Sequence, residues 1–218
     1  MNNKIVITND GSHSVFNSKI NEHYHSRHGS IVEAEHVFIR NGFSIVSNKQ
    51  MSILEIGLGT GLNALLTQHK AITKNINVFY HAIELFPIQK EIYTKLNFPE
   101  LIGIDQKELL KIHDCEWEIE NRINDYFNIK KECISLEDFD TDIKYDIIYF
   151  DAFSPEKQPE LWNKEIFSKM FNCLKNDGFL VTYCAKGIVK RTMKEVGFHV
   201  EVLDGPPGKR QMTKANKI

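Results

Sequence analysis

The sequence contains little cysteine and tryptophan, no long apolar run and almost no excess of charge of one sign. Of 218 residues, four are cysteines and two are tryptophans. The cysteines are far apart, without a Cys-x-x-Cys pair, which excludes a disulfide-stapled domain and disfavours a zinc site. No stretch of about 18 apolar residues occurs, so the sequence predicts no membrane span. The first residues carry no apolar segment of the signal-peptide type, and we expect a cytoplasmic protein.

The charge is balanced overall but uneven along the chain. With 27 basic and 29 acidic residues the net charge is −2, which excludes a uniformly basic nucleic-acid binder. From residue 186 to the end, however, eight basic residues face three acidic ones, a local charge of +5. The basic residues are Lys186, Lys190, Arg191, Lys194, Lys209, Arg210, Lys214 and Lys217. This segment predicts a phosphate-contacting face, with Lys209 and Arg210 placed on a stiff Gly-Pro-Pro-Gly loop.

Apolar strand patterns alternate with helical patterns from residue 51 onward, which predicts an α/β fold with an open, mostly parallel sheet covered on both faces. The predicted strands are 53–56, 78–83, 127–133, 145–150, 179–184 and 199–203, with a further strand opened by Trp117 and paired with 127–133. The first predicted helix begins at residue 62. The others cover 87–96, 106–112, 159–174 and 188–196, and Asn176-Asp177-Gly178 ends the helix 159–174.

Residues 1–50 form a separate block of different pattern. Residues 5–7 and 14–16 predict a β-hairpin, because the Asn-Asp-Gly between them tolerates the positive φ of a tight turn. A helix with Ile31, Ala34 and Phe38 at helical spacing follows. We therefore expect a small N-terminal β extension, 1–50, packed on a Rossmann-like domain, 51–218, as one structural unit.

A glycine loop joins the strand 53–56 to the helix after it. Its residues are Gly57, Leu58, Gly59, Thr60 and Gly61. Glycine lets the backbone turn tightly and approach a ligand, and the helix behind offers free N–H groups. Leu62 stands where the dinucleotide fingerprint has its third glycine, which disfavours a pyrophosphate. The Gly-x-Gly-x-Gly form, preceded by an acid, resembles the first motif of class I S-adenosylmethionine-dependent methyltransferases.

Glu84 follows the next strand, 23 residues after Gly61. A carboxylate at this place accepts hydrogen bonds from both ribose hydroxyls of a nucleoside cofactor. The acid that often contacts adenine after the third strand is not evident. Glu132, Asp138 and a backbone group are the open alternatives, and Ser135 to Asp138 resembles a capping box.

Asp151 opens a second loop, Asp-Ala-Phe-Ser-Pro, at the carboxyl edge of the sheet where open α/β folds bind ligands. Its layout is similar to the Asp/Asn-Pro-Pro-aromatic loop of amino-group methyltransferases. A carboxylate beside a primary amine accepts its proton or eases the growing ammonium charge. Phe153 and Pro155 are then candidates for the wall of a substrate pocket, although a core position for Phe153 and a helix-capping role for Asp151 are the alternatives.

Four blocks together carry a family resemblance from about residue 15 to the end. They are Tyr-His-Ser-Arg-His-Gly at 24–29, Leu-Glu-Ile-Gly-Leu-Gly-Thr-Gly-Leu-Asn at 54–63, the Asp151 loop with Pro-x-Leu-Trp at 159–162, and Gly-Pro-Pro-Gly-Lys-Arg-x-Met at 205–212. In this order the chain resembles the MnmD-type transfer-RNA methyltransferases, which occur alone and as the methyltransferase half of the two-domain MnmC enzyme.

The resemblance implies a Rossmann-like, mostly parallel seven-stranded sheet and methyl transfer from S-adenosylmethionine. The acceptor would be the amine of 5-aminomethyl-(2-thio)uridine at the wobble position of transfer RNA. Asp151 matches the family's active-site aspartate and Glu84 its ribose acid. Tyr24 and Ser26 would cover the methionine end of the cofactor, with Glu33 holding that segment. No FAD region is present in this sequence, so other enzymes would supply the precursor amine.

Three other interpretations are less consistent with the sequence. A small-molecule amine methyltransferase or a spermidine-synthase-like aminopropyltransferase shares the glycine loop and the aspartate, but the basic tail disfavours a polycation substrate. A non-enzymatic RNA-binding module would not need Glu84 and Asp151. A metal site at His23, His25 and His28 with Glu22 lacks a further ligand at metal-like spacing, and we expect no metal.

Overall fold

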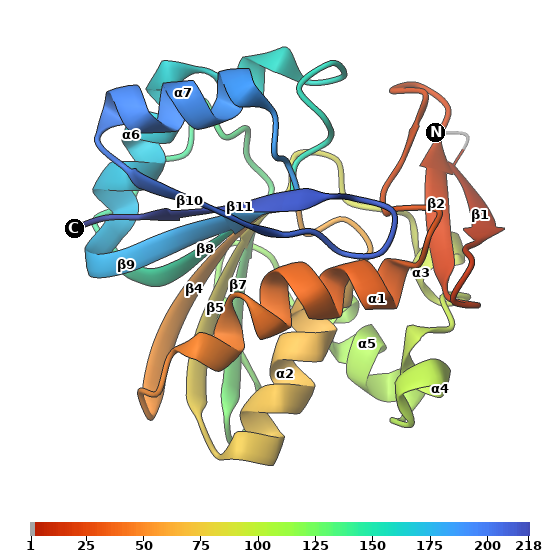
Figure 1. Ribbon diagram of the computed structural model, residues 1–218. Helices are drawn as coiled ribbons and strands as arrows, with labels where there is room; N and C mark the ends of the chain where they lie inside the picture. Colours follow the sequence, from red (N-terminus) through yellow and green to blue (C-terminus); the bar gives the residue numbers. More distant parts are fainter. Residues whose placement is uncertain (1–2) are drawn as a thin grey trace.

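A central eight-stranded sheet organises the chain in the computed structural model, which describes residues 3–218 (Figure 1). The spatial order is β10-β11-β9-β8-β4-β5-β7-β6. The strands are β4 (Gln50–Ile56), β5 (Asn77–Ile83), β6 (Glu120–Asn124), β7 (Phe127–Glu132), β8 (Tyr145–Phe150), β9 (Leu174–Thr182), β10 (His199–Asp204) and β11 (Gln211–Asn216). Only β6 and β11 run against the others. The predicted mostly parallel α/β sheet is confirmed, but it has eight strands and not seven, and β11 is the strand that the sequence pattern did not predict.

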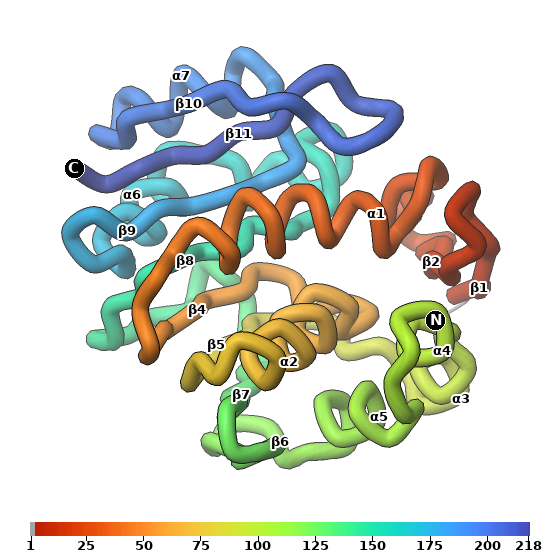
Figure 2. Tube along the Cα trace, turned by 60° about the horizontal axis from the view of Figure 1, so that its bottom comes forward, coloured from red at the N-terminus to blue at the C-terminus, as the bar shows by residue number. Residues whose placement is uncertain are grey.

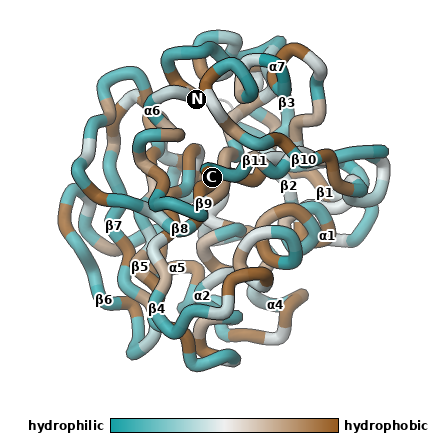
Figure 3. The backbone as a smooth tube through the Cα atoms, turned by 60° about the vertical axis from the view of Figure 1, so that its left-hand side comes forward, coloured by the Kyte–Doolittle hydropathy of each residue, from teal (hydrophilic) through white to brown (hydrophobic). Residues whose placement is uncertain are grey.

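Helices cover both faces of this sheet because its central strands are apolar on both sides. On β4, Ile53 packs into one apolar cluster and Leu54 into the other. One face carries α1 (Ser30–Ala34), which continues as a π-helix (Glu35–Arg40), with α2 (Leu62–Lys74) and α5 (Gln106–Asp114). The opposite face carries α6 (Lys164–Cys173) and α7 (Gly187–Val196). Figure 2 shows α1 and α2 in front of the sheet, and Figure 3 shows hydrophobic residues recurring along the central strands.

The N-terminal block is a three-stranded antiparallel sheet followed by α1. It contains β1 (Asn3–Ile7), β2 (His13–Asn17) and β3 (Glu22–His23), so the predicted hairpin is confirmed. The Asp10 carboxylate accepts the N–H of Ser12 within the turn and, through its other oxygen, the N–H of Val32 in α1. Val15 of β2 and Phe38 of the π-helix belong to the same apolar cluster as Ile53 of the large sheet. The boundary at residue 50 stays a prediction.

Three local predictions were wrong. The helix expected at 87–96 is limited to α3 (Lys90–Tyr93), and α4 (Phe98–Ile102) was not anticipated. The helix expected at 159–174 is divided at Asn163, whose extended backbone ends a 3-10 helix (Pro159–Trp162) and whose side chain caps α6 by accepting the Ile166 N–H. The expected stop at 176–178 therefore lies inside β9, after α6 has already ended.

The strand near Trp117 also begins later than expected. Glu118 has a φ of +67°, which interrupts extended backbone, and β6 starts at Glu120. A short 3-10 helix (Phe43–Ile45) leads into β4. Between residues 3 and 218 no helix is both long and apolar enough to cross a bilayer.

Candidate active site

The glycine loop between β4 and α2 turns so tightly that its three glycines all have positive φ, between 49° and 88°. A Cβ on Gly57 would lie 2.8 Å from the Asp151 carbonyl oxygen, and one on Gly59 would lie 2.9 Å from the Tyr24 ring. The loop is therefore packed between the Asp151 loop and the N-terminal segment, and larger residues do not fit there.

The segment Tyr24 to Ser26 lies over this loop. The His25 ring and the Thr60 hydroxyl are hydrogen-bonded at 2.6 Å, and the Ser26 N–H donates to Glu33 Oε2 at 2.9 Å. Glu33 thus holds the segment, as expected from the sequence. Burial lowers the pKa of His25 to about 4, so its imidazole is neutral at physiological pH.

Glu84 sits at the end of β5 and closes the other side of the loop. Its Oε2 accepts the Gly59 N–H at 2.9 Å, and its Oε1 accepts the Phe86 N–H at 2.8 Å. Each carboxylate oxygen keeps a second lone pair, which is what two neighbouring ribose hydroxyls would use. Burial raises the pKa of Glu84, while the two backbone donors lower it.

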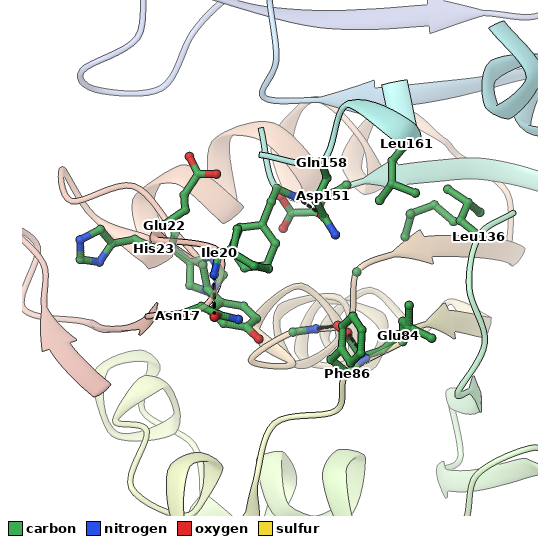
Figure 4. Close-up of a pocket in the computed structure, with 18 of the residues that line it drawn as sticks. Asn17, Ile20, Glu22, His23, Glu84, Phe86, Leu136, Asp151, Gln158 and Leu161 are labelled. Carbon is green, nitrogen blue, oxygen red and sulfur yellow. Dashed lines mark hydrogen bonds between the residues drawn. The ribbon is translucent and has the colours of Figure 1, made fainter. Parts of the chain in front are cut away.

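A cavity of about 690 Å³ lies at the carboxyl ends of the central strands. Gly57, Gly59, Glu84 and Asp151 line it, whereas Leu58, Thr60 and Gly61 lie behind the loop surface. Tyr24 and Ser26 also line it. In Figure 4, Asp151 and Glu84 project from different walls of this cavity. Its volume fits a nucleoside-sized ligand with room for a second group.

Asp151 is held by its backbone and by one side chain. Its N–H donates to the Ile56 carbonyl at 3.0 Å, which continues the sheet register into the loop. Its Oδ2 accepts a hydrogen bond from Asn63 Nδ2 at 2.8 Å. Burial, followed by the nearby Glu33 charge, raises the pKa of Asp151 to about 7, and Asn63 and Lys209 oppose the rise. A carboxylate of this basicity can exchange a proton with an amine near neutral pH.

The rest of the Asp151 loop is fixed by side chains from distant elements. The Ser154 hydroxyl donates to Glu22, and the Phe153 N–H donates to Gln158 Oε1. The Phe153 ring lines the cavity and meets the Tyr24 ring edge-on at a centroid distance of 4.9 Å. Pro155 does not line the cavity. Phe153 is therefore at the pocket wall and Pro155 behind it.

The two tail residues singled out in the sequence point to different places. Lys209 lines the cavity, where its Nζ is 2.5 Å from Glu33 Oε1 and 4.0 Å from the centre of the Tyr183 ring. Arg210 is exposed and lies outside the cavity. Lys217 donates to the carbonyls of Phe171 and Leu174 inside the fold. The eight tail cations therefore do not act as one surface.

The two acids considered for adenine contact do not line the cavity. Glu132 pairs with His81 at 3.1 Å, and Asp138 bonds to the Ser135 hydroxyl in a turn. The cavity wall at this place is formed instead by Ile134 to Glu137. Glu137, between the two candidates, is the acid that faces the cavity, and no spacing rule identified it.

Other residues at the site also escaped the sequence analysis. Glu22 was considered with the three histidines for a metal, but its carboxylate holds Ser154. Within residues 3–218 no group of three metal-ligating side chains is close enough to hold an ion. Tyr183 supports the loop by donating its hydroxyl to the Ala152 carbonyl at 2.9 Å. These contacts join residues more than 30 positions apart, which no local pattern encodes.

Comparison with known proteins shows the family of the chain. A family model described as S-adenosyl-L-methionine-dependent methyltransferase matches residues 107–218. The chain is 30% identical over 97% of its length to the tRNA 5-methylaminomethyl-2-thiouridine biosynthesis bifunctional protein MnmC of Campylobacter fetus, and 30% identical over 92% to that of Campylobacter hominis. It covers 35% and 31% of these relatives, so it spans about a third of their length.

A solved structure is similar over almost the whole chain. MNMC2 from Aquifex aeolicus superimposes with a TM-score of 0.77 at 25% identity, covering 98% of this chain and 70% of that one. The resemblance to the methyltransferase part of MnmC enzymes is therefore confirmed. Glycines that admit no Cβ, next to a carboxylate held by two backbone N–H groups, fit S-adenosylmethionine as cofactor. The chain belongs to the S-adenosyl-L-methionine-dependent methyltransferase family.

Proposed function

We propose that this enzyme methylates the primary amine of 5-aminomethyl-(2-thio)uridine at the wobble position of transfer RNA, giving the 5-methylaminomethyl nucleoside. The observation that carries the proposal is Asp151, a carboxylate with a pKa of about 7 on the wall of the cavity shared by Gly59 and Glu84. The names of the curated relatives support the same substrate.

The residues divide the cofactor site between them. Glu84 binds the ribose hydroxyls, Gly57 and Gly59 let the backbone approach the ligand, and Tyr24 and Ser26 cover its methionine end. The segment Ile134 to Glu137 borders the place left for the base. When bound, S-adenosylmethionine supplies a methyl group on a positively charged sulfur.

Asp151 handles the proton. The substrate ammonium gives one proton to the Asp151 carboxylate, which frees the nitrogen lone pair to form the new N–C bond. The S–C bond of the bound cofactor would break with its electrons on sulfur, and the product nitrogen would carry the positive charge. Asp151 then releases its proton to solvent. Phe153 and Leu161 on the cavity wall keep water away from the amine.

A small-molecule amine is the second candidate substrate, because acids are common on the cavity wall. They are Glu22, Glu33, Glu84, Glu137, Asp151 and Glu160, while Lys209 is paired with one of them. Such a lining attracts any cationic amine, including a polyamine. Aminopropyl transfer would require a decarboxylated cofactor, so the two candidates differ in a measurable way.

The first experiment measures methyl incorporation from labelled S-adenosylmethionine into transfer RNA from cells that lack this activity. The RNA is then digested to nucleosides, with Asp151→Asn as the matched inactive control. Label in 5-methylaminomethyl-type uridine is the expected result. If the protein binds S-adenosylmethionine but labels no RNA, the assignment to transfer RNA is wrong. Putrescine and spermidine, each with intact and decarboxylated cofactor, then test the second candidate.

A further inference from the structure

The side chain of Asn63, near the start of α2, lies between two carboxyl groups. Its Nδ2 donates to Glu55 Oε1 at 2.9 Å and to Asp151 Oδ2 at 2.8 Å. Asn63 is almost fully buried, so both bonds are shielded from water. One amide nitrogen with two hydrogens thus joins the end of β4 to the Asp151 loop.

Glu55 is fully buried, and no cation from residues 3–218 influences its carboxyl group. Its strand neighbours in register are Ala82 on β5 and Tyr149 on β8. The groups that influence its ionisation are Asp151, Asn63, Tyr80 and Glu84, none of which is positive. A carboxylate without a positive partner is very costly to bury, and the neutral acid is the stable form. Burial, then the Asp151 charge, raises the pKa of Glu55 well above its usual range.

Asp151 has a different set of neighbours. Glu33 from α1 faces it as a second acid, and Lys209 from the tail faces it as a cation. The Tyr183 hydroxyl is turned away to the Ala152 carbonyl. Among residues 3–218 no hydrogen-bond donor other than Asn63 reaches the Asp151 carboxylate. Its Oδ1 is therefore the oxygen left for a ligand.

We propose that Asn63 is a positioning residue for Asp151: one amide hydrogen fixes Oδ2, the other is anchored on an uncharged Glu55, and Oδ1 is left to face the amine. A lysine or arginine at this place would hold Asp151 strongly ionised and make it a poor base. The amide stabilises the carboxylate without a full charge, so Asp151 stays basic enough to take a proton. This inference rests on the proposed function for the identity of the amine. The hydrogen bonds of Asn63 to Glu55 and Asp151 do not depend on that function.

The test measures the titration of Asp151 directly. Protein labelled with ¹³C at aspartate carboxyl carbons is titrated by NMR, and Asp151 is assigned by the signal lost in Asp151→Asn. Asn63→Leu removes both donors and should raise the pKa of Asp151 by about one unit or more, because a bond to a charged group is lost. Asn63→Asp keeps the side-chain shape and should also raise the pKa of Asp151. This variant provides the test if Asn63→Leu does not fold.

Two control variants separate the positioning of Asp151 by Asn63 from a general disturbance of the fold. Glu55→Gln keeps an acceptor for Asn63 and adds no charge, so it should leave the Asp151 titration unchanged. Thr67→Val alters a buried polar group one turn further along α2 and should leave both titration and methyl transfer unchanged. In the Asn63 variants kcat should fall about tenfold or more, with the Kd for S-adenosylmethionine unchanged.

Three results decide the inference. An unchanged Asp151 titration in both Asn63 variants would overturn the positioning role. A lowered pKa of Asp151 in Glu55→Gln would show that Glu55 is charged, which overturns its role as a neutral anchor. If the titrations shift as expected but the wild-type protein methylates no RNA, the proposed substrate fails while the role of Asn63 stands.

Discussion

Lys209 and Glu33 are joined across 176 positions of sequence, with Lys209 Nζ 2.5 Å from Glu33 Oε1. The pair brings the C-terminal loop onto α1 at the rim of the cavity, and the Lys209 ammonium also lies over the Tyr183 ring. Both charges act on Asp151 in opposite directions. Burial is the main cause of the raised pKa of Asp151, and the Glu33 and Lys209 charges adjust it in opposite directions.

Removing the Lys209 charge should make Asp151 harder to ionise. Lys209→Met keeps most of the apolar stem and removes the cation that opposes Glu33 at Asp151. In the proposed reaction Asp151 must be ionised to accept the proton, so the acidic limb of the kcat profile should move to higher pH by about half a unit to one unit. Single-turnover methylation between pH 5 and 9 measures it. A limb that stays in place would mean that Lys209 does not influence the carboxylate.

Asp151 should affect chemistry more than cofactor binding. Asp151→Ala removes the proton acceptor and should lower kcat by about 10² or more, while the Kd for S-adenosylmethionine changes little. Isothermal titration with S-adenosylhomocysteine and single-turnover rates separate the two effects. An equal loss of cofactor affinity would contradict this division.

The same carboxylate should make stability depend on pH. Its pKa is about 7 in the folded protein against an ordinary 3.8, so the folded state holds the proton more tightly. Stability is then greatest below about pH 4 and is lost as pH rises through 7. Because Asp151 is partly exposed, we expect Asp151→Asn to be more stable than wild type by only about 1–2 kcal/mol at pH 8, with no difference at pH 4. Urea unfolding at the two pH values measures this, and an equal difference at both would contradict it.

Glu84 should control cofactor affinity. Glu84→Gln has one oxygen in place of two, so it loses one of the backbone bonds from Gly59 and Phe86 as well as a charged acceptor for ribose. We expect affinity for S-adenosylmethionine to fall about tenfold. The dependence of kcat on pH, which reports the ionisation of Asp151, should not change. Glu160→Gln is the comparison and should leave the affinity unchanged, since Glu160 lines the cavity and no hydrogen bond joins its carboxylate to the glycine loop within residues 3–218. Equal affinity in wild type and Glu84→Gln would remove Glu84 from the ribose site.

Arg210 and Lys209 should differ in their effect on RNA. Arg210 is exposed and free to meet phosphate, whereas Lys209 is paired in the cavity. Arg210→Ala should reduce the slope of log K against log salt by about 0.7 to 0.9 for one contact. Lys209→Met should leave the slope as it is. Filter binding of transfer RNA from 50 to 300 mM salt gives both values, and the opposite pattern would reverse the assignment.

Much of the architecture could be predicted because it depends on local pattern. Strands 145–150 and 78–83 are mostly apolar, each with one polar residue, Asp146 and His81, and the Asp-Gly turn makes the first hairpin. The errors occurred where a side chain overrode the pattern. Asn163 caps α6 and divides a segment with helical periodicity, and Glu118 adopts positive φ before β6.

The sequence by itself determined the chemistry available to this protein: the glycine loop, Glu84 and Asp151 follow three strands whose carboxyl ends must meet at one edge of a parallel sheet. Tertiary structure alone decided how these groups are tuned. It placed Lys209 with Glu33 in the cavity, gave Glu22 to Ser154, and set Asn63 between Glu55 and Asp151. The reason is physical: proton affinity depends on burial and on charges within a few ångströms, and these neighbours come from segments far apart in the chain.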